Sequence, residues 1–364
     1  MKRSFTLIEL IIVIVIMGIL STITFDILSR VYKNYIYTKE TNKINEKINT
    51  AIDIISAKLK YRIHNSVIVT KYPAKYGDDD KDKVDFKYIG LLQDNDKDYK
   101  ILEWINKDIE AKNGMWDNNQ KHIQTGWSGF DDLDEAIKTQ ENPKEFNLTT
   151  PNSNFNIVKL IDRNITASYG EDVDTFENNI TTLIFAGNDL GGDIVVDENQ
   201  SYGWYRNKDK NRTAKAVFAI LDYGVNRNNK NVPSTEINIT SIDENNDTTL
   251  YSRYFLTRTA YAIVPIENNE TLADGTKIND FNLTLVYNYQ PWRNDWWNGK
   301  SNVNNDTNAH GEVNSTLIAT HVTEIRFKKD VTTPMIRVYI CIQSPEVEIN
   351  STRNLTICKE KAIF

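Results

Sequence analysis

The sequence predicts an α+β protein in which one long N-terminal helix packs on an antiparallel β-sheet head with long loops. Three observations predict this fold. An apolar run fills residues 5–25, branched apolar residues recur at helical spacing over residues 44–59, and alternating apolar residues separated by Asn- and Asp-rich turns dominate from about residue 155. A helix laid on one face of an antiparallel sheet buries both apolar surfaces.

The apolar run is long enough to cross a membrane. From Phe5 to Phe25 there are 21 residues, which as a helix span roughly the 30 Å of a bilayer core. Lys2 and Arg3 precede the run, so the short N-terminus is expected in the cytoplasm and the rest outside it. No Ala-x-Ala cleavage pattern follows, so the segment is expected to stay as a single-pass anchor.

Glu9 is the single charged residue of this run. A carboxylate within a membrane span costs about 2.5–3.5 kcal/mol, and such residues are usually functional. Either Glu9 lies near enough to the interface to escape this cost, or it meets a cationic partner inside the membrane.

The helix is expected to continue beyond the membrane as an amphipathic half over residues 26–62. Its apolar stripe recurs at steps of three and four residues and consists of Ile44, Ile48, Ile52, Ile55 and Leu59. No Pro, and no Gly after Gly18, interrupts the pattern through Lys60. The stripe therefore predicts the face that docks on the sheet.

Two further regions are expected after the helix. Residues 63–150 form a mixed polar region with a short helix expected at Ile101–Ala111, and residues 151–364 form a β-rich head. The expected strands of the head are Phe155–Ile161, Thr181–Phe185, Asp193–Val196, Ala216–Leu221, Glu236–Ser241, Tyr251–Val264, Phe281–Tyr289, Leu317–Phe327, Met335–Ile342 and Leu355–Cys358.

Composition excludes several classes of function. The formal net charge of −7 over 364 residues argues against a phosphate-binding surface, so no nucleic acid partner is expected. The four histidines form no ligand-spaced pair, and two cysteines alone cannot build a zinc site. No P-loop, GxGxxG or nucleophile motif is present, so we expect no catalytic residues and no enzyme.

The N-terminus resembles that of type IV prepilins and type II secretion pseudopilins. The resemblance is carried by the basic residues before Ser4, by the hexapeptide Phe5-Thr6-Leu7-Ile8-Glu9-Leu10, and by the apolar run containing Gly18. It covers about 25 residues and is highly specific. Ser4 stands where the family usually has Gly, and Phe25-Asp26 stands where many pilins have a helix-kinking Pro, so a straighter helix is expected.

The resemblance implies processing and assembly sites. A prepilin peptidase would cut between Ser4 and Phe5 and methylate the new amine of Phe5. Glu9 would then meet the N-terminal amine of a neighbouring subunit, and charge-assisted pairing would offset the burial of both groups. The implied partners are the peptidase and other pilin or pseudopilin subunits. The implied location is the bacterial inner membrane, with the head in the periplasm and, after assembly, in a filament.

A large head suits a sparse subunit better than a repeated one. The layout resembles the larger minor subunits of the PilW and GspJ type, so the expected role is a minor pilin or pseudopilin that primes or caps a filament. The alternative is a membrane-anchored, adhesin-like module. Its binding loop for a glycan, surface or secreted substrate would contain Trp292, Trp296 and Trp297; a small core under a long loop explains these tryptophans equally well.

Cys341 and Cys358 lie in neighbouring strand candidates near the end of the chain. In an oxidising compartment they would form a disulfide that clamps this segment, as the resemblance also suggests, at about 3 kcal/mol on the loop-entropy model. Two free buried thiols are the alternative.

Thirteen Asn-x-Ser/Thr sequons occur, and eleven of them carry Asp or Glu two residues before the Asn; ten of these eleven are taken as glycosylation candidates. This extended form resembles the acceptor of a class of bacterial periplasmic oligosaccharyltransferases. An Asn-, Asp- and Thr-rich composition explains plain sequons but not the acidic bias. The ten glycosylation candidates are Asn147, Asn164, Asn179, Asn211, Asn238, Asn246, Asn269, Asn282, Asn314 and Asn350, of which Asn238 and Asn282 lie in expected strands.

Asp94, Asp96 and Asp98 match the first three ligand spacings of a calcium loop. Tyr99 replaces the required Gly, and Ile105 replaces the closing Glu. A solvated acidic loop is therefore favoured over a calcium site, and no other cofactor is expected.

Overall fold

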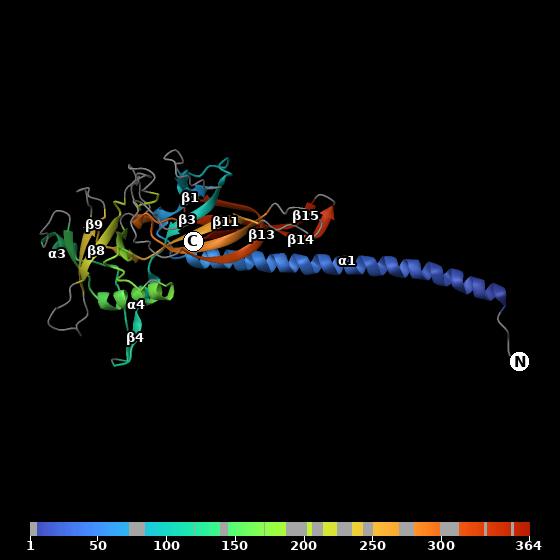
Figure 1. Cartoon of the computed structure of the whole chain (residues 1–364), viewed down its shortest axis with the longest axis horizontal. Coiled ribbons are helices and arrows are strands. Elements are labelled where there is room, and N and C mark those ends of the chain that lie inside the picture. Colours follow the sequence, from blue (N-terminus) through green and yellow to red (C-terminus); the bar gives the residue numbers. More distant parts are fainter. Residues whose placement is uncertain are drawn as a thin grey trace.

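The computed structural model describes residues 6–72, 84–119, 121–138, 145–170, 172–186, 202–205, 214–223, 235–242, 250–268, 280–298, 313–330, 333–350 and 353–364. A long helix extends from a head built on two β-sheets, and the N-terminus lies at the far end of this helix (Figure 1). This arrangement confirms the predicted α+β fold with a long helix on an antiparallel sheet.

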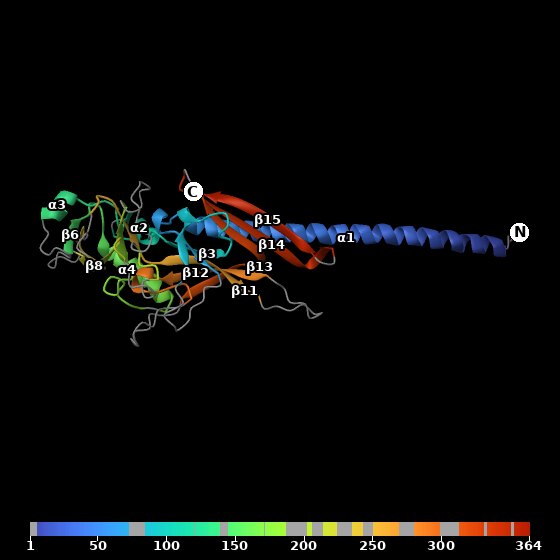
Figure 2. The same ribbon diagram turned by 90° about the horizontal axis from the view of Figure 1, so that it is seen from above.

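Helix α1 (Leu7–Leu59) is continuous over 53 residues, or about 80 Å at 1.5 Å per residue. Its C-terminal half packs against β13, β14 and β15 (Figure 2). Ile48, Ile55 and Leu59 are fully buried in this contact, as the predicted stripe requires. The stripe forms because steps of three and four residues return side chains to one face of a helix.

The larger sheet has eight antiparallel strands in the order β15-β14-β13-β12-β11-β3-β1-β2. One face packs on α1, and the other face carries a second apolar cluster. Its strands are β1 (Ile68–Lys71), β2 (Phe86–Tyr88), β3 (Tyr99–Ile105), β11 (Ala260–Glu267), β12 (Phe281–Tyr289), β13 (Asn314–Lys329), β14 (Ile336–Asn350) and β15 (Arg353–Ile363).

The smaller sheet lies at the end of the molecule remote from the N-terminus (Figure 1). It has five antiparallel strands in the order β10-β7-β8-β9-β6, and its core includes residues of α4. Its strands are β6 (Glu145–Thr149), β7 (Thr182–Phe185), β8 (Val217–Tyr223), β9 (Glu236–Ser241) and β10 (Tyr254–Thr257).

Several short elements lie outside the two sheets. Strands β4 (Met115–Asp117) and β5 (His122–Gln124) pair as a separate hairpin. The helices are α2 (Ile109–Asn113), α3 (Leu133–Lys138) and α4 (Phe155–Ser168), and 3₁₀ turns occupy His64–Ser66, Ile89–Leu91 and Pro291–Arg293.

The strand expected at Phe155–Ile161 is wrong, because this segment opens α4. Asn154 caps the helix by accepting a hydrogen bond from the Ile157 amide on its side-chain oxygen. The buried residues Phe155, Val158 and Asp162 recur at helical spacing. Because Asp162 interrupts the apolar stripe of this helix, the helical periodicity was not evident in the sequence.

The helix expected at Ile101–Ala111 is also wrong. Strand β3 occupies most of this segment and lies between β11 and β1, where both faces are covered. A strand covered on both faces carries a continuous apolar run, which cannot be told from a buried helix by periodicity. Asp108 then caps the short helix α2 through the Ala111 amide.

The single strand expected at Tyr251–Val264 is divided into β10 and β11, which belong to different sheets. Each sheet contains strands from both sides of residue 150, because β3 pairs with β11 and β6 pairs with β9. The expected strands at Thr181–Phe185, Ala216–Leu221, Glu236–Ser241, Phe281–Tyr289, Leu317–Phe327, Met335–Ile342 and Leu355–Cys358 coincide with β7, β8, β9, β12, β13, β14 and β15, while Asp193–Val196 lies outside the described residues.

Candidate functional site

The apolar half of α1 is bare. Its side chains, from Leu7 (77% exposed) to Phe25 (71%), contact no part of the head. By length and composition this helix can cross a membrane. So large a continuous apolar surface requires cover by lipid or by other protein chains.

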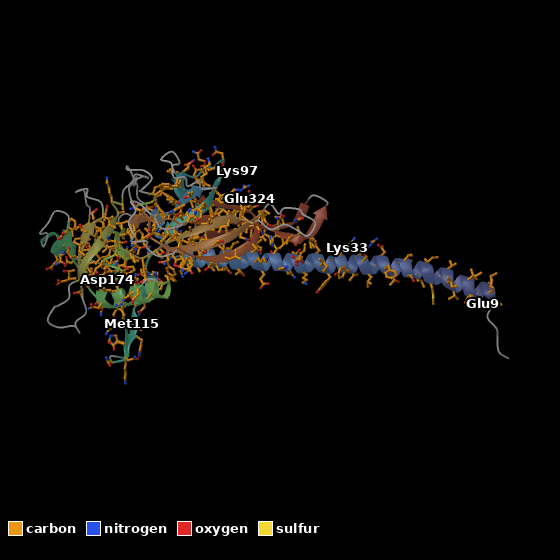
Figure 3. The ribbon with its side chains drawn as sticks, viewed as in Figure 1. Glu9, Lys33, Lys97, Met115, Asp174 and Glu324 are labelled. Carbon is orange, nitrogen blue, oxygen red and sulfur yellow. A yellow bond between two sulfur atoms is a disulfide. The ribbon has the colours of Figure 1, made fainter. Side chains whose placement is uncertain are left out.

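Glu9 lies in the first turn of α1, at the end of the molecule farthest from the head (Figure 3). Its Oε2 accepts hydrogen bonds of 2.9 Å from both the backbone amide and the hydroxyl of Thr6. The negative charge is also favoured by the helix dipole at this terminus. Both bonds use one carboxylate oxygen, so the second oxygen can accept from another donor. Ser4 and Phe5 lie outside the described residues, so their processing stays a prediction.

Two threonine hydroxyls of the apolar half are satisfied within the helix. The hydroxyl of Thr22 donates to the Ile19 carbonyl at 2.8 Å, and that of Thr24 donates to the Leu20 carbonyl at 2.7 Å. Such bonds let hydroxyls enter hydrocarbon at low cost. The carboxylate of Glu9 remains as the one charged side chain of residues 5–25.

Polar contacts at the edges of the docking surface fix α1 on the head. Glu40 is buried against β14 and accepts a 3.0 Å hydrogen bond from the hydroxyl of Ser344. At the sheet edge, Lys359 and Lys361 of β15 reach Asn49 (2.9 Å) and Asp53 (2.8 Å) on the helix.

Arg62 fastens the end of the helix to the distal strands. Its guanidinium is 1% exposed and donates to the main-chain oxygens of Leu59 (2.8 Å), Phe364 (3.1 Å) and Pro334. These contacts join residues almost the whole chain apart. Helix α1 and the head are therefore firmly joined.

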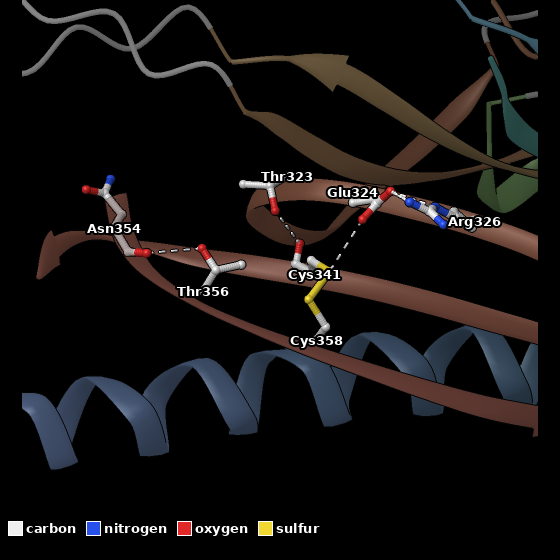
Figure 4. The surroundings of a disulfide bond; sticks show 7 residues. All are labelled: Thr323, Glu324, Arg326, Cys341, Asn354, Thr356 and Cys358. Carbon is white, nitrogen blue, oxygen red and sulfur yellow. Dashed lines mark hydrogen bonds and ion pairs between the residues drawn. A yellow bond between two sulfur atoms is a disulfide. The ribbon is translucent and has the colours of Figure 1, made fainter. Parts of the chain in front are cut away.

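Cys341 and Cys358 form a disulfide between β14 and β15 (Figure 4). They face each other in the strand register, with their Cα atoms 4.0 Å apart. On the neighbouring strand β13, the Thr323 hydroxyl lies 3.5 Å from the Cys341 carbonyl. The disulfide closes the outermost hairpin of the sheet, beside α1, and supports the predicted clamp over the alternative of free thiols.

Most described sequons lie in regular structure. Asn147, Asn238, Asn282, Asn314 and Asn350 occupy strands, Asn164 is exposed on α4, and Asn179 lies in a turn just before β7. An acceptor must reach an enzyme in an extended, flexible segment, which a strand or helix does not provide. Asn211, Asn246 and Asn269 lie outside the described residues, so glycosylation stays a prediction.

Part of the acidic bias at these sequons has a structural role. Asp280, two residues before Asn282, is buried and lies 2.9 Å from the imidazole of His321 and 3.0 Å from the Gln343 amide. Asp162, two residues before Asn164, is buried in α4. Packing alone explains these two acidic residues.

The tryptophans of the 291–299 segment serve mainly as core. Trp292 is 1% exposed, and its indole donates a 2.7 Å hydrogen bond to the Asn179 carbonyl. Trp296 and Trp297 are half-buried against the same apolar cluster, with their rings 5.7 Å apart. Trp292 has no surface to offer a ligand, whereas Trp296 and Trp297 keep part of theirs, so a binding role for this segment stays a prediction.

The three aspartates of the calcium-like loop differ in their surroundings. Asp94 pairs with Lys328 at 3.0 Å, and Asp96 pairs with Lys87 at 2.8 Å. The hydrogen bond from Lys87 is the main cause that lowers the pKa of Asp96. Asp98 is exposed. Among the residues that the structure describes, no three His, Cys, Asp or Glu side chains form a metal site.

The sequence did not indicate two buried charged groups. Glu103 of β3 accepts hydrogen bonds from the hydroxyls of Thr70 (2.7 Å), Tyr289 (3.0 Å) and Tyr205, and burial raises its pKa to about 7. Glu103 lies within the apolar run that forms β3, and nothing in the neighbouring sequence indicates that its carboxylate is buried.

The second group pairs Asp162 of α4 with Arg258, which lies between β10 and β11, at 3.7 Å. The hydroxyl of Thr181 donates to Asp162 at 2.6 Å. Burial and the nearby carboxyl of Asp108 raise the pKa of Asp162. The pair lies where the chain crosses from one sheet to the other, so it joins the two sheets rather than forming an open site.

Comparison with known proteins gives one match. Residues 1–25 match the family model described as the prokaryotic N-terminal methylation motif. No curated protein and no solved structure matches the chain at a significant level. The match covers the segment that contains Glu9 and supports the type IV pilin and pseudopilin family.

Proposed function

We propose that this chain, whose first 25 residues carry the prepilin methylation motif, is a minor subunit that primes or caps a type IV pilus or a type II secretion pseudopilus. The observation that carries the proposal is the bare apolar half of α1, with Glu9 as its one charge. Lipid covers this surface before assembly, and the helices of other subunits cover it afterwards.

Glu9 is the assembly carboxylate in this proposal. A prepilin peptidase frees and methylates the amine of Phe5, and the ammonium of a neighbouring subunit pairs with Glu9 in hydrocarbon. Since both groups lose water on entering the filament core, each is favoured there only when the other is present. The head then faces the periplasm, away from the bundle of helices.

The size of the head supports a minor role. The head contains two sheets at one end of a single helix (Figure 1), and its larger sheet runs alongside that helix (Figure 2). Repeating such a head at every position of a tightly packed filament requires much more room than the helices do. One copy at an end of the filament avoids that conflict.

The test compares Glu9→Ala with Asp26→Ala, a change of the next carboxylate along the same helix, which is exposed and pairs with Arg30 at 2.9 Å. Both variants should remain in the membrane fraction. Only Glu9→Ala should be lost from sheared filaments or from the secretion assembly. The intact mass of the mature protein should match a chain that begins at a methylated Phe5. Normal incorporation of Glu9→Ala would contradict the proposed role.

A further inference from the structure

The β4–β5 hairpin projects from the head as a separate two-stranded arm. It leaves the head near α4, on the side of the larger sheet where α1 lies, and its residue Met115 is visible at the edge of the molecule (Figures 1 and 3).

The arm presents an apolar pair to the outside. Trp116 and Ile123 face each other across the two strands and are 57% and 59% exposed. A cross-strand aromatic–aliphatic pair is the usual stabilising unit of a buried sheet face. Here that face is bare, although Trp104 and Trp127 of the same region are buried. An exposed Trp beside an aliphatic side chain is typical of a protein–protein anchor.

The arm is firmly mounted, as an anchor requires. Gly114 has a φ of +74°, and a Cβ there would lie 1.7 Å from the Gln124 carbonyl oxygen. At Gly126 a Cβ would lie 2.0 Å from the Ala111 carbonyl oxygen. The two strands are therefore in close contact at the base of the arm. The backbone amide of Asn154, at the start of α4, donates to the Gly126 carbonyl at 2.6 Å.

Two polar side chains of the arm, Asp117 and Gln124, bond within the protein. The side-chain amide of Gln124 donates to the Asp117 carboxylate. The side-chain amide of Asn154 donates to the side-chain oxygen of Gln124 at 3.3 Å. A sugar-binding aromatic ring normally has polar neighbours aimed at the ligand's hydroxyls. Because Asp117 and Gln124 bond to one another and the aliphatic Ile123 lies beside Trp116, the arm favours a protein recess over a glycan.

We propose that the Trp116–Ile123 arm anchors the head to a neighbouring pilin-like subunit, by inserting into an apolar recess on that subunit's head. This inference rests on the proposed function. The arm reaches out on the side of the head where α1 lies, so a subunit whose helix packs along the bare face of α1 meets the arm with its own head. Contact at the helices and contact at the arm then form one continuous interface.

The test uses the full-length protein in its own cells, with a photo-crosslinking phenylalanine analogue at position 116. A second strain carries the analogue at Leu20 in the apolar half of α1, and a control strain carries it at Leu221 of β8, which is 48% exposed. Crosslinked products are identified by mass spectrometry. We expect the products from positions 116 and 20 to contain a second protein with a prepilin-type N-terminus, and the product from position 221 to lack one.

The variant Trp116→Ala, combined with the analogue at Leu20, gives a second measurement. Because Trp116 is exposed, the thermal unfolding midpoint should stay unchanged while filament incorporation falls at least threefold. Crosslinking at 20 but not at 116, or unchanged incorporation, overturns the arm and leaves the proposed function standing. A product at 116 that contains a glycan or an unrelated protein also overturns it. Absence of products at both positions overturns the proposed function and the arm together.

Discussion

Replacing Glu103 by Gln should remove the part of the pH dependence of folding between pH 5 and pH 8 that this buried carboxyl contributes. Glu103 lies on the central strand β3, is fully buried and accepts three hydroxyl hydrogen bonds. Burial is the largest cause of its raised pKa, because a carboxylate loses its hydration in the core whereas the protonated acid loses much less.

The magnitude follows from linkage. The pKa of Glu103 is raised from 4.5 to about 7 in the folded protein, and each pKa unit corresponds to about 1.4 kcal/mol. Between these two pH values the folded state holds a proton that the unfolded state has released, so the free energy of unfolding falls as pH rises. The stabilising contribution is complete below pH 4.5 and is lost by about pH 7, a decrease of about 3 kcal/mol.

The assay is urea unfolding of the full-length protein in detergent, followed by tryptophan fluorescence at pH 5 and pH 8. The free energy of unfolding of the wild type should fall between these two pH values by about 3 kcal/mol more than that of Glu103→Gln. The control is Glu177→Gln, which changes an exposed glutamate and should retain the wild-type slope. Equal pH dependence in Glu103→Gln and the wild type would refute the reasoning.

Three further predictions concern the stability of the head. Ile48→Ala, at a fully buried position of the docking face, should lower the free energy of unfolding by about 2–5 kcal/mol, whereas Ile27→Ala on the bare helix should leave the thermal midpoint of the head unchanged. Arg258→Ala should cost about 3–5 kcal/mol in chemical denaturation, because it leaves a buried carboxylate unpaired; a cost below 1 kcal/mol would contradict this role. Replacing Cys341 and Cys358 by Ser should lower the free energy of unfolding by about 3 kcal/mol on the loop-entropy model, and a reducing agent should then have no further effect on the double variant.

The sequence predicted the elements whose periodicity is strong and local. The stripe of α1 repeats over four turns, and apolar residues alternate cleanly in β9 and at the start of β14, so these elements were visible without tertiary information. Strand β3 was mistaken for a helix because burial on both faces removes alternation. Helix α4 was mistaken for a strand because Asp162 lies in its buried stripe, paired with an arginine far along the chain.

The candidate sites divide in the same way. Glu9 could be found because a charge in an apolar run is conspicuous in one dimension. The roles of Trp116 and Trp292 could not be told apart from sequence, since each lies in a polar segment and only packing decides that one is exposed and the other buried. Glu103 and its three hydroxyl partners come from four separate segments, which no local pattern connects.

Because α1 is continuous, it fixes the direction in which Glu9 points, about the helix axis, relative to the head. Each residue turns a helix by about 100°, and the helix has neither a kink-forming proline nor a linker between Glu9 and the docked stripe. Adding or deleting one residue between Asp26 and Lys39 would therefore swing the head by about 100° about the rod while Glu9 keeps its setting in the membrane. The number of residues between Glu9 and the docked stripe sets the orientation of the head about the helix axis. It therefore determines which side of the head a neighbour engaged at Glu9 will meet.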